Sequence, residues 1–235
     1  MSSLNILSGG AAHGLVTSLV PELKARTGLD ISGEFGAVGA MAEKLRNGVA
    51  ADIAILTAAL LARLADEKLV VPSSIADVGL VETALAVRSA DPKVSVKDAD
   101  DLRAAFLAAD AIFVPDTKAS TAGIHVAKVL NQLGIAATVE TRLKIYPNGA
   151  TAMRHLAASD AARPIGCTQS TEIISTKGVV LSGALPPGCG LATMYTAGIT
   201  THAANADAAQ VLIDLLTGAE QHQLRTGAGF LSNSK

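Results

Sequence analysis

The stretch Leu4-Asn5-Ile6-Leu7-Ser8-Gly9-Gly10-Ala11-Ala12-His13-Gly14 joins a short apolar strand to a turn of small residues, and an amphipathic helix follows. Small residues at such a turn leave backbone N–H groups accessible at the N-terminus of the helix. These N–H groups and the helix dipole both favour negative charge. The stretch therefore predicts a site for a small anion, unless its glycines serve only to make a tight turn.

The composition narrows the class of protein. Of the 235 residues, 49% are apolar and 17% are charged, which favours a buried core over disorder. Aromatic residues make up only 3%, the net charge is −2, and no run of Lys or Arg is present, so we expect no nucleic-acid partner. No apolar stretch is long enough to span a bilayer, so we expect no membrane insertion.

Other sequence features bear on cofactors and location. Cys167 and Cys189 lack the spacing of metal ligands and are expected to be buried free thiols, so no metal or cofactor is predicted. The first strand begins almost at once, without the features of a signal peptide. The sequence as written therefore predicts a cytoplasmic protein, or a periplasmic one if a signal peptide has been removed.

Strand and helix patterns alternate along nearly the whole chain. Strands are expected at about residues 4–7, 29–35, 52–56, 80–88, 111–114, 138–146, 164–168 and 190–200. Helices are expected at about residues 13–26, after 36–39, and at 57–65, 101–108, 120–133, 148–158, 169–174, 204–216 and 219–226. This order predicts an α/β fold of two lobes, each a mostly parallel sheet flanked by helices, with a cleft between them. Lobe I would comprise residues 1–85 and 190–235, and lobe II residues 86–189.

Ligands of open parallel sheets bind beyond the carboxyl ends of the strands. The turns expected there are residues 8–13, 36–39, 56–58, 118–121, 146–149 and 168–172. Most of them open a helix with small or capping residues, which favours a compact anion. The predicted ligand-binding residues are Ser8, Gly9, Gly10, Ala11, Ala12, Gly36, Ala37, Val38, Ser120, Thr121, Asn148, Gly149 and Gln169.

Five motifs extend over most of the chain. They are the Gly/Ala turn at 9–12, Thr27-Gly28-Leu29, Phe35-Gly36-Ala37-Val38-Gly39, Asn47-Gly48-Val49-Ala50-Ala51-Asp52-Ile53 and Ile165-Gly166-Cys167-Thr168-Gln169. With these motifs the chain resembles the molybdate-binding proteins of ABC transporters and, more broadly, the type II periplasmic binding proteins. The resemblance implies a two-lobed fold that closes over a small anion.

The chain departs from this family at the oxyanion contacts. Molybdate binders use a serine in the first turn and one in the second, which correspond here to Ala11 or Ala12 and to Val38. The family tyrosine corresponds to Gln169. Each lost charge-assisted hydrogen bond would weaken binding by roughly 1.5–3 kcal/mol. Molybdate and tungstate are therefore not the expected ligands, and a di- or tricarboxylate is.

Aconitate isomerase resembles the same family and shifts a double bond in a tricarboxylate, which suggests an enzyme. His13, at the start of a helix, would be the base, or else it is a surface histidine. Lys118 would pair with a ligand carboxylate, or it is a solvated loop residue. Tyr146 would act as an acid or face a carboxylate, or it packs in the core. Ser120 and Thr121 serve mainly as N-caps, and Glu172 is a base or a residue that stabilises its own helix.

The leading hypothesis is an isomerase that moves an allylic proton in a bound carboxylate. The alternative is the substrate-binding receptor of an ABC importer for molybdate or another small anion, with an ABC permease as its partner. An intracellular anion sensor is a third class. A receptor needs no base, so loss of His13 would leave affinity nearly unchanged in a receptor and abolish turnover in an isomerase.

Overall fold

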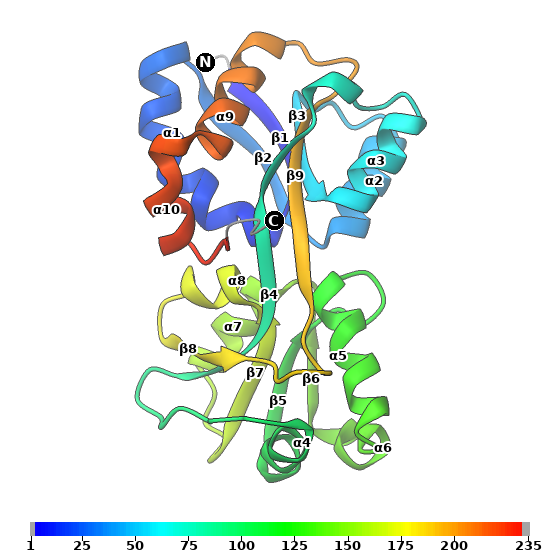
Figure 1. Ribbon diagram of the computed structural model, residues 1–235, viewed down its shortest axis with the longest axis vertical. Coiled ribbons are helices and arrows are strands. Elements are labelled where there is room, and N and C mark those ends of the chain that lie inside the picture. Colours follow the sequence, from blue (N-terminus) through cyan, green and yellow to red (C-terminus); the bar gives the residue numbers. More distant parts are fainter. Residues whose placement is uncertain (1–2, 232–235) are drawn as a thin grey trace. The chain divides into compact units, whose positions relative to one another are not determined.

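The computed structural model describes residues 3–231, and the chain divides into two compact units (Figure 1). Unit 1 comprises Met1–Val81 and Thr193–Lys235, and unit 2 comprises Glu82–Ala192. The chain passes from one unit to the other within β4 (Ala76–Arg88) and near the start of β9 (Ala192–Ile199). The sequence analysis places the lobe boundaries after residues 85 and 189, and these boundaries remain a prediction.

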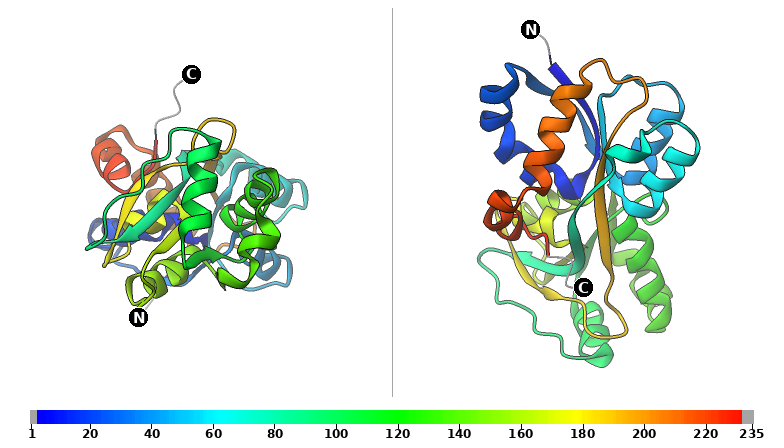
Figure 2. Two further views of the ribbon diagram at one scale, coloured as in Figure 1. Left: turned by 90° about the horizontal axis from the view of Figure 1, so that it is seen from below. Right: turned by 45° about the horizontal axis from the view of Figure 1, so that its top comes forward.

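Unit 1 is built on a four-stranded sheet in the order β2-β1-β3-β9. Its remaining strands are β1 (Ser3–Gly9), β2 (Asp30–Gly36) and β3 (Ile53–Thr57). Strand β1 pairs in parallel with β2 and β3, and β9 is antiparallel to β3. The helical segments are η1 (Gly10–Ala12), α1 (His13–Thr27), α2 (Val38–Arg46), α3 (Ala58–Asp66), η2 (Pro72–Ser74), α9 (Ala206–Thr217), η4 (Ala219–Gln221) and α10 (His222–Gly227). Helix α9 packs beside α1, while α2 and α3 lie together on the other side of the sheet (Figures 1 and 2).

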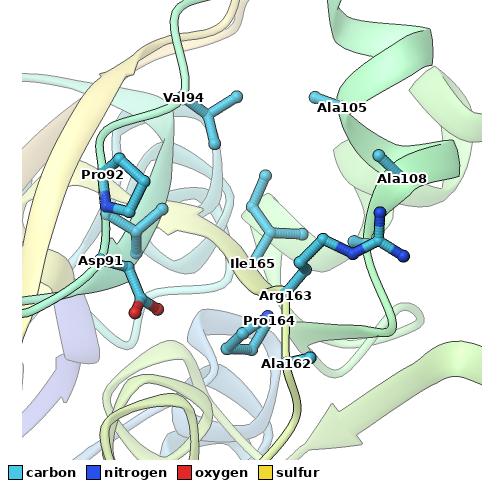
Figure 3. Close-up of a pocket in the computed structure, with 11 residues that line it drawn as sticks. Asp91, Pro92, Val94, Ala105, Ala108, Ala162, Arg163, Pro164 and Ile165 are labelled. Carbon is cyan, nitrogen blue, oxygen red and sulfur yellow. The ribbon is translucent and has the colours of Figure 1, made fainter.

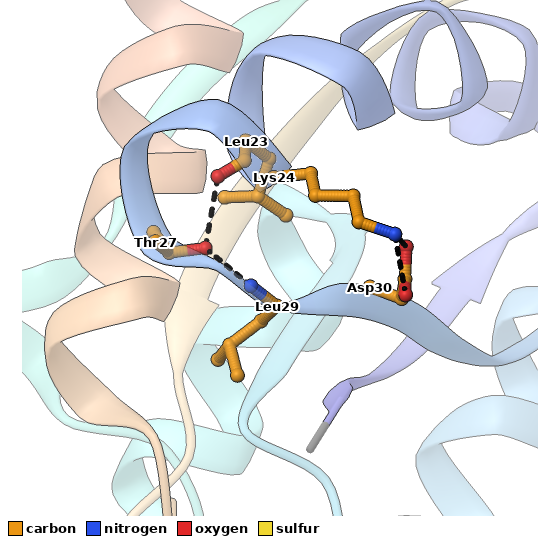
Figure 4. Close-up of polar contacts among 5 residues, drawn as sticks. All are labelled: Leu23, Lys24, Thr27, Leu29 and Asp30. Atoms are coloured by element: carbon orange, nitrogen blue, oxygen red, sulfur yellow. Dashed lines mark hydrogen bonds and ion pairs between the residues drawn. The ribbon is translucent and has the colours of Figure 1, made fainter. Parts of the chain in front are cut away.

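The turn from α1 into β2 shows why the Thr27-Gly28-Leu29 segment ends a helix (Figure 4). Gly28 adopts a left-handed conformation (φ 74°) that L-residues with side chains disfavour, and its N–H donates to the Lys24 carbonyl. Thr27 Oγ1 donates to the Leu23 carbonyl at 2.8 Å and accepts from the Leu29 N–H at 3.2 Å. Lys24 Nζ then reaches Asp30 Oδ1 at 2.8 Å, so helix and strand are linked on both sides of the glycine.

Asp52 connects three segments of unit 1. Its carboxylate is buried and accepts from the backbone N–H groups of Asn5 and Asn205, each at 2.8 Å. The Asn205 side chain donates to the same carboxylate at 3.3 Å. One buried side chain thus ties the start of β3 to β1 and to the segment before α9.

Unit 2 contains a mixed sheet in the order β4-β7-β5-β6, with β8 on the other side of β4. Its strands are β5 (Ala111–Pro115), β6 (Leu143–Tyr146), β7 (Pro164–Gln169) and β8 (Val179–Ala184), together with the second part of β4. Strand β5 is parallel to β6 and β7, and β4 is antiparallel to β7 and β8. The helical segments are α4 (Ala99–Ala108), α5 (Thr121–Gln132), α6 (Ala136–Val139), η3 (Glu140–Arg142), α7 (Gly149–Ala157) and α8 (Ser170–Ile174).

Alternate residues of β5 enter different cores, which shows that both faces of this sheet are covered. Ile112 and Val114 pack in a cluster with residues of α4 and α5, whereas Ala111 and Phe113 pack in a cluster with residues of α7 and α8. The continuous apolar run 111–114 therefore marks a strand buried on both faces, as expected from the sequence.

Two segments differ from the sequence-based expectation. Residues 138–142 are helical, and only Leu143–Tyr146 of the predicted strand 138–146 is extended. Ile135 and Val139 are both buried, and their spacing of four is the period of a helix. Strand β8 was not expected, because only Val179 of its residues is buried and Gly183 interrupts the pattern.

Candidate functional site

The parallel strands of unit 1 bring three helix N-termini to one edge of the sheet. Gly9, which ends β1, is the register partner of Gly36, which ends β2, and Ser8 lies opposite Ile55 of β3. Segment η1–α1 and helices α2 and α3 begin directly after these three strands. We call residues 9–13, 36–40 and 57–58 the unit 1 edge.

The helices of the unit 1 edge begin without an acceptor from their own side chains. Gly9, Ala37 and Thr57 occupy the N-cap positions in extended conformations, and none makes a side-chain capping hydrogen bond. The helix expected at residues 57–65 therefore begins at Ala58, after an N-cap threonine whose hydroxyl makes no cap bond. None of these helices carries an acidic residue in its first turn. Their N-termini therefore keep a positive potential that an anion from outside can use.

The side chains of the unit 1 edge are mostly apolar. Ala11, Ala12 and Val38 are buried there, and so is the backbone of Gly10. Ser8 is fully buried and its Oγ donates to the Gly9 carbonyl at 2.9 Å. The polar groups that this edge can offer are therefore chiefly backbone N–H groups.

Tyr195 is a residue of this edge that sequence reasoning missed. It lies on β9, opposite Thr57, and is buried. A Cβ placed on Gly9 would lie 2.9 Å from Tyr195 Cε1 and 2.8 Å from Val38 Cγ1. Gly9 is thus required for close packing, and the rarity of aromatic residues in this chain is the signal that could have drawn attention to Tyr195.

His13 lies at the start of α1 with an exposed side chain. Its ring meets the ring of Phe35 edge to face, with 4.7 Å between the centroids and an angle of 81° between the planes. Phe35 directly precedes Gly36, so this ring contact links the start of α1 to the end of β2 within the unit 1 edge.

The carboxyl ends of β5, β6 and β7 meet in the same way at one edge of the unit 2 sheet. We call residues 116–121, 146–150 and 168–172 the unit 2 edge. In the β5–α5 turn, Asp116 Oδ1 accepts from the N–H groups of Lys118 at 2.7 Å and Ala119 at 2.9 Å. The Lys118 side chain is exposed. The acceptor for the N–H groups of this turn is thus a carboxylate of the chain itself.

Two further helices of the unit 2 edge are capped by their own side chains. Ser120 Oγ accepts from the Gly123 N–H at 3.5 Å, and Asn148 Oδ1 accepts from the Thr151 N–H at 2.8 Å. Thr121, the first residue of α5, is half-buried. The N-cap role predicted for Ser120 is confirmed, and Asn148 has the same role in α7.

The side chain of Glu172, a residue of α8, lies at the N-terminus of α7. Its carboxylate is buried and accepts from Thr168 Oγ1 at 2.6 Å and from the backbone N–H groups of Gly149 and Ala150. Burial raises the pKa of this carboxyl, while these hydrogen bonds and one from the Gln169 N–H act in the opposite direction. The position at which a ligand anion would meet α7 is therefore filled by the chain's own carboxylate.

Tyr146 stands in an aromatic stack. Its ring lies 4.2 Å from that of His155, with 15° between the planes, and 6.1 Å from that of Phe113, with 6° between the planes. The side chain is half-buried. The competing interpretation of Tyr146 as a packing residue thus accounts for its ring.

Gln169 is a buried polar residue of the unit 2 edge whose side chain makes no hydrogen bond to the described residues. Its exposed fraction is 3%, and neither Nε2 nor Oε1 makes a hydrogen bond within residues 3–231. Thr83 Oγ1 and Thr171 Oγ1 are also buried without a partner in this described part of the chain. Thr83 is the register partner of Gln169 on the adjacent strand β4, so the two side chains are neighbours on one face. Thr83 and Thr171 were missed from the sequence because no motif marks them.

A cavity of about 340 Å³ lies at the opposite edge of the unit 2 sheet, where β5 and β7 begin (Figure 3). Val94 lies on one side and Ala105 and Ala108 on the other, with Ile165 between them. Its two charged lining residues are engaged: Asp91 pairs with Arg88 at 2.6 Å, and Arg163 pairs with Asp110 at 3.0 Å. This cavity is apolar and does not have the chemistry of an anion site.

Residues 4–231 match the family of bacterial extracellular solute-binding proteins. The chain belongs to this family. Its fold is similar to that of the periplasmic molybdate-binding protein of Azotobacter vinelandii, with a TM-score of 0.79 and 17% identity over 97% of this chain and 99% of that one. It is also similar to the sulfate-binding protein SubI of Mycobacterium tuberculosis, with a TM-score of 0.75 and 18% identity over 100% and 88% of the two chains.

A third similar structure is that of PEB3 bound to L-phospholactate, with a TM-score of 0.69 and 16% identity over 98% of this chain and 100% of that one. At these identities the likeness concerns the fold, and it confirms the predicted two-lobed α/β class. No protein of curated function matches the sequence.

The family corrects two predictions. The isomerase prediction is wrong, because the chain is a member of a solute-binding family and its structural neighbours are named as binding proteins. The catalytic roles expected for His13, Lys118 and Tyr146 are withdrawn with it. The cytoplasmic location is likewise unsupported, since the family is extracellular. Within residues 3–231, no helix has the length and apolar character needed to cross a membrane.

Proposed function

We propose that this solute-binding protein is the receptor of an ABC importer and captures a small anion with the backbone N–H groups of the unit 1 edge. The supporting observation is the distribution of acidic residues among helix N-termini. The helices of the unit 1 edge have none in the first turn, whereas α4 has Asp100 and Asp101 and α9 has Asp207. The first turns at the unit 1 edge thus hold no acidic residue that would compete with a bound anion, whereas α8, which follows the parallel strand β7, has Glu172 in its first turn.

The binding residues proposed for this edge are those whose backbone or side chain lies there. They are Gly9, Gly10, Ala11, Ala12, Gly36, Ala37 and Val38. Ser8 keeps a supporting role, because its hydroxyl donates to the Gly9 carbonyl. A periplasmic location and an ABC permease as partner follow from this proposal.

The test is a charge placed at the start of α2. Ala40 is exposed and lies in the first turn of this helix. Ala40→Glu adds a carboxylate that stabilises the helix by about 0.3–1 kcal/mol through its dipole and competes with a bound anion. Ala40→Gln has nearly the same shape without the charge and is the matched control.

The measurement is isothermal titration with a panel of anions, comprising molybdate, sulfate, phosphate and small carboxylates, after a thermal-shift screen has selected those that bind. We expect Ala40→Glu to weaken binding of the selected anion by at least about 5-fold while the melting temperature stays equal or rises. Ala40→Gln should bind as the wild type does. Equal affinity of both variants, or no binding of any anion by the wild type, would contradict the proposal.

A further inference from the structure

The unpartnered amide of Gln169 contains information about the solute. A primary amide has an oxygen that accepts hydrogen bonds and a nitrogen that donates them. Both atoms are buried and unpaired in the part of the chain that the structure describes. Turning the amide over exchanges the two atoms but still leaves one acceptor and one donor to be satisfied.

Among residues 3–231, no neighbouring polar group makes a hydrogen bond to this amide. Glu172, the nearest carboxylate in sequence, already accepts from Thr168 and from the N–H groups at the start of α7. Thr83 and Thr171 add two buried hydroxyls without partners, and each can donate as well as accept. Buried polar groups in folded proteins are almost always hydrogen-bonded, so a cluster of three unpaired groups at the carboxyl end of β7 indicates a polar partner from outside the chain.

We propose that the solute is an anion that carries its own O–H donor, and that Gln169, Thr83 and Thr171 recognise this group. The inference rests on the proposed receptor function and specifies its substrate class. A fully deprotonated oxoanion such as molybdate or sulfate can only accept hydrogen bonds, so it offers no donor to Gln169 Oε1. A hydroxycarboxylate donates through its hydroxyl and accepts through its carboxylate, and it satisfies both ends of the amide. Monohydrogen phosphate has the same combination of donor and acceptor.

The experiment compares solutes that differ by this donor. Wild-type protein is titrated calorimetrically near neutral pH with malate and succinate, which differ by one hydroxyl, and with phosphate, sulfate and molybdate. We expect the donor-bearing member to bind at least about 10-fold more tightly than its partner without the donor. Tighter binding of malate than of succinate would indicate a hydroxycarboxylate receptor. Tighter binding of phosphate than of sulfate would indicate a phosphate receptor.

Gln169→Leu tests whether this residue makes the distinction. In this variant the donor-bearing solute and its partner without the donor should bind with affinities within about twofold of each other. The melting temperature should stay equal or rise, because the substitution removes an unpaired buried amide. Gln210→Leu is the control, since Gln210 is an exposed glutamine of α9. A structural role for Gln169 would instead lower the melting temperature and leave the ratio unchanged.

The outcomes separate the two proposals. If sulfate or molybdate binds as tightly as the donor-bearing solutes, the substrate class is overturned and the receptor function stands. A ratio that survives in Gln169→Leu overturns the assignment to Gln169. If no anion binds, the receptor proposal fails and this inference fails with it.

Discussion

Gly149→Ala tests the placement of the Glu172 carboxylate directly. A Cβ at Gly149 would lie 1.9 Å from Glu172 Oε2 and 2.1 Å from Thr168 Oγ1. Both distances are far inside van der Waals contact, and the neighbours are buried and bonded to each other. The methyl group therefore forces the carboxylate away from the start of α7.

The magnitude follows from the hydrogen bonds that are lost. Hydrogen bonds to a charged group contribute about 1.5–3 kcal/mol each, and displacement of Glu172 breaks at least two of them, from Gly149 and from Thr168. Alanine in place of glycine in a helix returns about 1 kcal/mol. The free energy of unfolding should thus fall by roughly 2–5 kcal/mol, which lowers the melting temperature by roughly 4–20 °C for a chain of this size.

The assay is urea unfolding followed by circular dichroism, with Gly227→Ala as the matched control. Gly227 also lies in a helix, but a Cβ there would meet nothing within 4 Å. We expect the control to match or slightly exceed wild-type stability. In the background of Glu172→Ala, Gly149→Ala should be less harmful by about 0.5–3 kcal/mol. Two results would refute the placement of Glu172 at α7. One is an equal loss of stability in Gly149→Ala and Gly227→Ala, and the other is additive effects of Gly149→Ala and Glu172→Ala in the double variant.

Three further predictions concern other side chains. Asp52→Asn should lower the free energy of unfolding by about 1–3 kcal/mol in urea titrations, because the Asn5 and Asn205 N–H groups lose a charged acceptor; an unchanged midpoint would count against its role as a connector. Since burial raises the pKa of Glu172 above its ordinary value of 4.5, the folded state binds this proton more tightly than the unfolded chain. The stabilisation from this proton is complete below pH 4.5 and is lost as the pH rises through the raised pKa of the folded state. The free energy of unfolding of the wild type minus that of Glu172→Gln should therefore decrease between mildly acidic and neutral pH. A difference that does not change with pH would exclude this pKa shift. His13→Ala should leave the dissociation constant of a bound anion within about threefold of wild type, measured by calorimetry, because a receptor needs no base; a larger loss would show that His13 contacts the solute.

Most of the fold could be predicted from the sequence because its signals are local. The alternation of apolar strands with amphipathic helices fixes the class, and the small residues after each strand fix where the helices begin. Strand β8 was not predicted from the sequence, because an edge strand with one buried residue lacks the alternation of apolar and polar residues that marks a half-buried strand. Threonine and valine in segment 138–142 favour a strand. In the structure the segment is helical, and this conformation lets Ile135 and Val139 pack together in the core.

The candidate site was harder to predict, because turn composition locates helix N-termini but does not tell whether they are occupied. Glu172 was expected to act on its own helix or as a base, yet its carboxylate serves α7. Asp116 likewise provides the acceptor for its own turn. Both depend on contacts formed only in the folded chain, and no spacing in the sequence announces them. Gln169 was recognised only through the resemblance at its position, and its unpaired state required the structure.

These internal acceptors change how a turn of small residues should be interpreted. Most of the six predicted turns have a composition that suits an anion, but those before α5 and α7 already hold carboxylates of the chain. The turns before α1, α2 and α3 hold none from their own first turns, and the amide beside α8 lacks a partner altogether. The first group therefore stabilises the fold, and we propose that the second binds the solute. Substitutions in the first group should act chiefly on the melting temperature, and those in the second chiefly on affinity.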